Sequence, residues 1–60
     1  MTYFEVIGFK DKTYRKNYCG MAYARSRAFK LRKSGYSNII VRRVTMSEDG
    51  VTTGETLMRL

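Results

Sequence analysis

The stretch NYCGMAYARSRAFKLRKSG, from Asn17 to Gly35, predicts the one helix of this 60-residue chain and thereby decides its fold. Alanines and straight-chain residues favour a helix, Asn17 is a suitable N-cap, and Gly35 can end the helix after Ser34. At 100° per residue, the apolar positions fall on one stripe: Met21, Ala24, Ala28 and Leu31. This stripe predicts the buried face, and its two alanines would let the helix lie close to a sheet.

Three segments around this helix are typical of β-strands, because they are rich in β-branched and aromatic residues. They are YFEVIGFK (Tyr3–Lys10), SNIIVRRVTM (Ser37–Met46) and VTTGETLMRL (Val51–Leu60). The intervening SEDG (Ser47–Gly50) predicts a turn that makes the last two strands antiparallel. Gly8 in the first strand indicates either a bulge or a close approach of the helix.

We therefore predict a single α+β domain over residues 1–60, in the order β-α-β-β, with one helix packed on one face of a small three-stranded sheet. Apolar residues occur on both sides of the strands, as the neighbours Ile39 and Ile40 illustrate. A sheet with one wet face would show a cleaner alternation. We expect the open sheet face to contact a partner, and a homodimer through this face is the simplest arrangement.

Positive charge dominates the composition. The chain has 12 Lys+Arg and 5 Asp+Glu, a formal net charge of +7, and between Lys10 and Arg43 the only acid is Asp11. Such a field attracts polyanions. No apolar run approaches the roughly 18 residues that cross a bilayer, and no signal-peptide pattern opens the chain. We expect a cytoplasmic protein without membrane contact.

Catalytic residues are scarce. Histidine is absent, Cys19 is the only cysteine, and the carboxylates are scattered along the chain. The commonest general base and the commonest metal ligand are therefore missing together. A single thiol without an activating base is not a candidate nucleophile. We predict a non-enzymatic protein that needs no metal and no cofactor.

The stretch FKDKTYRKNY (Phe9–Tyr18) is expected to be a basic loop ahead of the helix, where free N–H groups also favour anions. Cations bind phosphates, and tyrosines stack on unpaired bases. Contact with nucleic acid, contact with a protein, and a merely solvated loop all remain open. The candidate residues are Lys10, Lys12, Tyr14, Arg15, Lys16 and Tyr18.

Two further candidates involve arginines. Arg42 and Arg43 are neighbours on a strand and so face opposite ways; they either bind a ligand or flank the hairpin and discourage edge pairing. On the helix, Arg25 and Arg32 flank Phe29. Their stems either cover this ring at the rim of the core or extend the basic surface of the loop.

These observations favour a small basic protein that contacts nucleic acid through a Lys/Arg/Tyr surface. One helix is too few for a helix-turn-helix, and neither an aromatic RNP-like octamer nor a GXXG loop is present. Affinity would come mainly from phosphates, with little sequence specificity.

The succession of YFEV, an alanine-containing helix and GYSNIIVRRV resembles small bacteriophage accessory proteins, in particular T7-type inhibitors of host RNA polymerase. The resemblance implies an alternative function, in which Arg42 and Arg43 contact the acidic surface of a host enzyme or defence factor. The chain departs from that family in being more basic and in adding the hairpin SEDGVTTGETLMRL.

Overall fold

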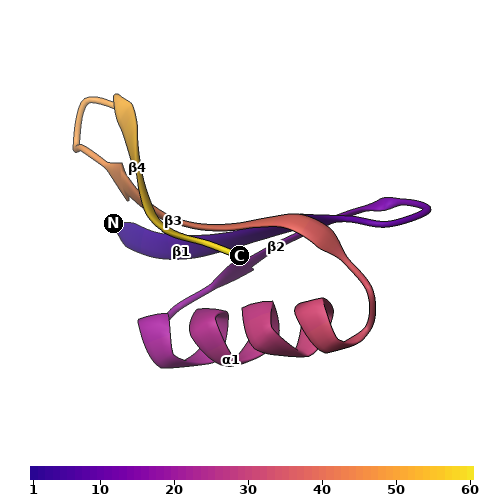
Figure 1. Ribbon diagram of the computed structural model, residues 1–60. Coiled ribbons are helices and arrows are strands. Elements are labelled where there is room, and N and C mark those ends of the chain that lie inside the picture. Colours follow the sequence, from indigo (N-terminus) through magenta and orange to yellow (C-terminus); the bar gives the residue numbers. More distant parts are fainter.

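The computed structural model describes residues 1–60 as one helix on one face of a four-stranded antiparallel sheet, with the strand order β2-β1-β3-β4 (Figure 1). The elements are β1 Thr2–Phe9, β2 Thr13–Tyr18, α1 Met21–Lys33, β3 Ser37–Met46 and β4 Thr52–Arg59. The predicted α+β class and the single helix on one face are confirmed. The predicted order β-α-β-β with three strands is wrong, because the order is β-β-α-β-β with four.

The additional strand is β2, so the prediction of a basic loop over Phe9–Tyr18 is wrong for Thr13–Tyr18. This strand pairs antiparallel with β1, Gly8 opposite Tyr14 and Phe4 opposite Tyr18. Its two charged residues, Arg15 and Lys16, are adjacent, so this segment lacks the alternation of apolar and polar residues that is typical of a strand. An edge strand accepts such charges, since only one of its sides is hydrogen-bonded and only one face is covered.

The helix begins later than the sequence predicts. Asn17 lies in β2, and the N-cap is Gly20, whose backbone is extended and which offers no side-chain hydrogen bond. The C-terminal end is as predicted: Gly35 has a φ of +92°, a value that favours glycine. Tyr36 N–H then donates to the Leu31 carbonyl, which closes the last turn.

The core lies between α1 and the centre of the sheet. The predicted helix stripe is confirmed, because Ala24, Ala28 and Leu31 are buried and Met21 packs against them. A Cβ added to Gly8 would make only an ordinary contact of 3.4 Å with Leu31 Cδ1, so the packing of the helix does not require glycine there. The pairing of β1 with β3 shifts register beside this glycine. The buried cluster consists of Val6, Ala24, Ala28, Leu31, Ile39 and Val41.

Alternation along the strands separates two surfaces. On β3, Ile39, Val41 and Arg43 face the helix, whereas Ile40 and Arg42 face the other way. The helix packs against β1, β2 and β3, and the β3–β4 hairpin bends away from it (Figure 1). The sheet surface opposite the helix is called the open face below. The only helix is neither long nor apolar enough to span a membrane.

Candidate polyanion-binding groove

A groove with a volume of about 470 Å³ runs between β2 and α1. We call it the β2–α1 groove. Three of its eight lining residues are cations, and none is acidic. Its chemically important side chains are Lys16, Tyr18, Cys19, Tyr23, Arg27 and Lys30.

The two secondary structures explain why these side chains converge. Alternation along β2 turns Tyr14, Lys16 and Tyr18 toward the helix, opposite Gly8, Val6 and Phe4 of β1. On α1, residues three and four positions apart share a flank, which brings Tyr23, Arg27 and Lys30 to the groove. Cations from a strand and from a helix thus face one space.

Two tyrosines of β2 contact each other, and only one of them, Tyr18, lines the groove. The Tyr14 and Tyr18 hydroxyl groups are hydrogen-bonded to each other, and the Tyr14 ring meets the Tyr36 ring edge-on with centroids 6.3 Å apart. Burial raises the pKa of Tyr14 to about 12; the hydrogen bond with Tyr18 adds to the increase, and the charge of Arg27 opposes it. Tyr14 is therefore a neutral structural residue at ordinary pH.

The rim of the groove is more accessible. The Tyr23 side chain is 66% exposed, and its ring lies against Gly20, where a Cβ would come within 3.2 Å of Tyr23 Cδ2. Lys16 Nζ lies 5.9 Å from the centroid of the Tyr18 ring, a cation–π contact. An exposed ring beside several cations can stack on a base while the cations neutralise phosphates.

The β1–β2 turn lies apart from this groove. Lys10 Nζ donates a hydrogen bond to the Ser34 carbonyl at 2.8 Å and lies 5.7 Å from the centroid of the Tyr36 ring, so it supports the C-terminal end of α1. Lys12 borders a smaller hollow with Lys10, Asp11 and Tyr36. Of the six candidates in the stretch Phe9–Tyr18, only Lys16 and Tyr18 line the groove.

Arg15 and Arg42 lie on the open face, where both contact one carboxylate. Arg15 Nε is 3.0 Å from Glu5 Oε2, and Arg42 Nη1 is 3.6 Å from Glu5 Oε1. Arg43 faces the helix side, as alternation predicts, and pairs with Glu55 at 2.7 Å. The two neighbouring arginines therefore have separate surroundings.

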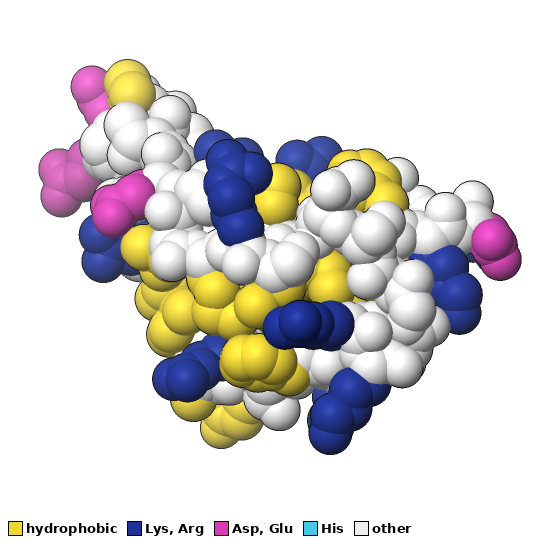
Figure 2. Space-filling view, viewed as in Figure 1, with side chains coloured by type: hydrophobic (Ala, Val, Ile, Leu, Met, Phe, Trp, Pro, Cys, Tyr) yellow, Lys and Arg dark blue, Asp and Glu magenta, His cyan; other side chains and the backbone are white.

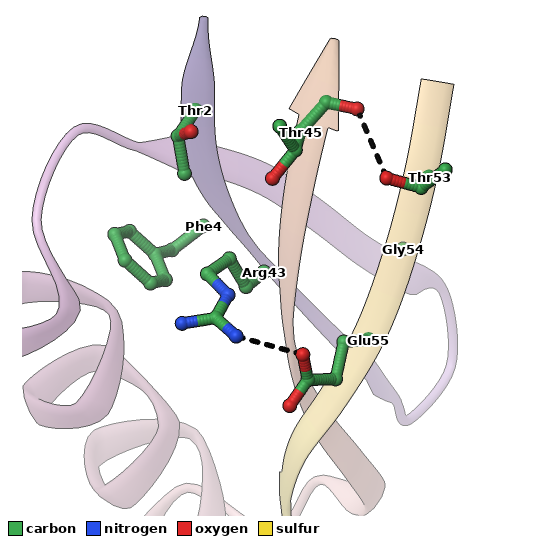
Figure 3. A pocket seen from close by; sticks show the side chains of 7 residues that line it. All are labelled: Thr2, Phe4, Arg43, Thr45, Thr53, Gly54 and Glu55. Atoms are coloured by element: carbon green, nitrogen blue, oxygen red, sulfur yellow. Dashed lines mark hydrogen bonds and ion pairs between the residues drawn. The ribbon is translucent and has the colours of Figure 1, made fainter. Parts of the chain in front are cut away.

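Arg43 belongs to a shallow hollow of about 610 Å³ beneath the β3–β4 hairpin. Figure 3 shows Arg43 and Glu55 pointing toward one another beside Phe4. The remaining lining residues are polar or small: Thr2, Thr45, Thr53 and Gly54. Because the ion pair is satisfied within the hollow, this site lacks the excess positive charge of the groove.

Arg25 and Arg32 lie on the flank of α1 that faces away from the groove. The Arg25 guanidinium is 6.0 Å from the centroid of the Phe29 ring, and Phe29 remains partly exposed. This arrangement matches arginine stems that cover an aromatic ring at the rim of the core.

Tyr23, Arg27 and Lys30 are not among the site residues predicted from the sequence. A signal was present, because α1 contains five cations and no acidic residue. A helix of that composition cannot offset its own charge through neighbouring pairs. These residues share a groove with Lys16, however, only because Lys16 lies on a strand beside α1.

Charge is unevenly distributed over the surface. Figure 2 shows Lys and Arg side chains around the helix, and Asp and Glu side chains at the two ends of the molecule. Asp11 lies in the β1–β2 turn, and Glu48 and Asp49 lie in the β3–β4 turn.

Comparisons with protein-family models, with curated proteins and with solved structures found no match for this chain.

Proposed function

We propose that this chain is a small non-enzymatic nucleic-acid-binding protein, and that the β2–α1 groove holds the backbone of a single strand. The observation that carries the proposal is the convergence of Lys16, Arg27 and Lys30 from two elements without a neighbouring carboxylate. Phosphates are the commonest polyanionic partner of such a surface. We place this activity in the cytoplasm.

A single strand fits the groove better than a duplex does. The cations of the site line a groove shared by β2 and α1, whereas a recognition helix presents its own exposed side to a major groove. Tyr23 at the rim offers a ring for an unpaired base, which a duplex keeps within its stack. The groove contributes charge and one aromatic face, so we expect little preference for sequence.

Salt dependence provides the test. Binding of a fluorescent mixed-sequence DNA strand is measured by anisotropy over a salt series that starts near 50 mM. Replacing Lys16, Arg27 and Lys30 together by glutamine should reduce the slope of log K against log salt by about 2, at roughly 0.7 for each lost phosphate contact. The matched control replaces Arg25, Arg32 and Lys33 by glutamine, because it removes the same charge from the rest of α1.

The two triple variants have distinct expected outcomes. The groove variant should lose most of the affinity and of the salt slope, whereas the control should lose only the small part due to net charge. Equal losses in both variants would reject the groove as the site. Absence of wild-type binding near 50 mM salt would reject the nucleic-acid function itself.

A further inference from the structure

Three charged residues form a row across the open face. Glu5 on β1 lies between Arg15 on β2 and Arg42 on β3, at 3.0 Å and 3.6 Å. The Glu5 side chain is only 12% exposed, whereas those of Arg15 and Arg42 are 62% and 36% exposed. The carboxylate is thus enclosed, and both guanidinium groups reach solvent.

Each arginine keeps most of its donors free. A guanidinium carries five N–H groups, and Arg15 uses only Nε toward Glu5. Arg42 approaches Glu5 through Nη1 alone. Glu5 therefore holds two planar cations in place and leaves most of their N–H groups free. Each guanidinium can donate two hydrogen bonds to a further carboxylate.

An apolar floor accompanies this row. Cross-strand pairs place Tyr3 opposite Val44 and Ile7 opposite Ile40 on the same face. Val44 is buried, whereas Tyr3, Ile7 and Ile40 are half-buried and remain partly accessible. Such a mixture of aliphatic surface and arginine is typical of the centre of protein interfaces.

The open face carries excess positive charge. Arg59 lies opposite Ile40 and so shares this face with Arg15 and Arg42. The negative charge of Glu5 therefore offsets only one of these three positive charges. A second copy docked face to face would bring these arginines together, which is unfavourable. A nucleic-acid strand would find Tyr3 as the one aromatic ring among the four residues of this floor, and the other three are aliphatic.

We propose that the open face docks an acidic segment of a partner protein. Its carboxylates contact Arg15 and Arg42, and its aliphatic side chains cover Tyr3, Ile7 and Ile40. This surface lies on the opposite side of the sheet from the β2–α1 groove, so the two sites can be occupied together. The proposal stands independently of nucleic-acid binding.

Glu5 is a positioning residue in this scheme. Replacing it by glutamine raises the net charge by one, so simple attraction predicts tighter binding of an acidic partner. If Glu5 acts by orienting the guanidinium groups, Glu5→Gln instead weakens binding despite the added charge. The two accounts thus predict opposite signs.

The test uses ¹⁵N-labelled protein and a short peptide in which glutamate and valine alternate. Saturable chemical-shift changes are expected at Tyr3, Ile7 and Ile40, and none with the matched lysine–valine peptide. Arg42→Gln and Arg15→Gln should each weaken the glutamate peptide about tenfold, as expected for an arginine at the centre of an interface. Arg25→Gln, on the helix, is the control for loss of one charge.

Other outcomes overturn the proposal. The open face is not an acidic-segment site if the peptide shifts only the groove residues, if it fails to bind, or if a DNA strand produces the same open-face changes. Sedimentation showing a dimer, with these signals changing as the protein is concentrated, would assign the face to a second copy instead. Tighter binding to Glu5→Gln would remove the positioning role.

Discussion

The Arg42 guanidinium occupies the space beside Gly54 that a side chain would fill. A Cβ added to Gly54 would overlap Nη2 of Arg42 and lie 3.0 Å from its Cζ. Gly54 is opposite Val44 on the open face, next to the pair formed by Arg42 and Thr56. The absence of a side chain on β4 thus lets this arginine lie flat and reach Glu5.

Gly54→Ala is therefore predicted to separate stability from binding. The added methyl group displaces the flexible end of Arg42 at little cost, and alanine in place of glycine stabilises a strand by about 0.5–1 kcal/mol. The midpoint of urea unfolding should stay unchanged or rise slightly. Affinity for the glutamate–valine peptide should fall, because Arg42 leaves Glu5. Thr53→Ala, on the other face of β4, should leave this affinity intact; an equal loss there would contradict the prediction.

Tyr23→Ala is predicted to weaken binding of a DNA strand by about 1–3 kcal/mol, the usual contribution of one base stacked on an aromatic ring. The ring is exposed at the groove rim, so folding should change little. Anisotropy with the strand and with its duplex provides the measurement. Tyr23→Phe keeps the aromatic face and should bind as the wild type does. An equal loss with strand and duplex would show that Tyr23 does not stack on a base.

Tyr14 predicts a pH dependence of stability. Its pKa is raised to about 12 in the folded protein, so the folded state holds the proton more tightly than the unfolded state, whose pKa is near 10. The resulting stabilisation is fully present below pH 10 and is lost as the pH rises toward 12. Tyr14→Phe should lower the free energy of unfolding by about 0.5–1.5 kcal/mol at neutral pH. As the pH rises, the free energy of unfolding of this variant should fall less steeply than that of the wild type.

Urea unfolding between about pH 8 and pH 12 measures this difference, provided that wild type and variant are compared at each pH. Tyr23→Phe serves as the control, because its exposed hydroxyl is not part of the Tyr14–Tyr18 pair. Its curve should run parallel to that of the wild type. A parallel curve for Tyr14→Phe as well would contradict the role assigned to Tyr14.

The neighbours Ile39 and Ile40 should differ sharply on truncation. Ile39 is 1% exposed in the core, whereas Ile40 is half-buried on the open face. Ile39→Ala is expected to cost about 2–5 kcal/mol, a large part of the stability of so small a domain. Ile40→Ala should cost clearly less. Circular dichroism during urea unfolding checks this, and equal costs would mean that the open face is covered in solution.

The sequence predicted the helix core well because that information is local. The 3.6-residue period places Met21, Ala24, Ala28 and Leu31 on one stripe wherever the helix packs. Side chains along a strand alternate between its two faces, which likewise predicts that Arg42 and Arg43 lie on opposite faces of the sheet. Strand β2 was missed because TYRKNY lacks an alternation of apolar and polar residues, and its pairing depends on the free edge of β1.

The sequence by itself determined the helix, its buried stripe, three of the four strand positions and the excess of positive charge, because composition and periodicity are properties of neighbouring residues. Only the tertiary structure decided which charges act together. Lys16 joins Arg27 and Lys30 because β2 packs beside α1, and Glu5 restrains Arg15 and Arg42 because β1 lies between β2 and β3. Such convergence depends on the order of strands in the sheet, which residue spacing does not encode.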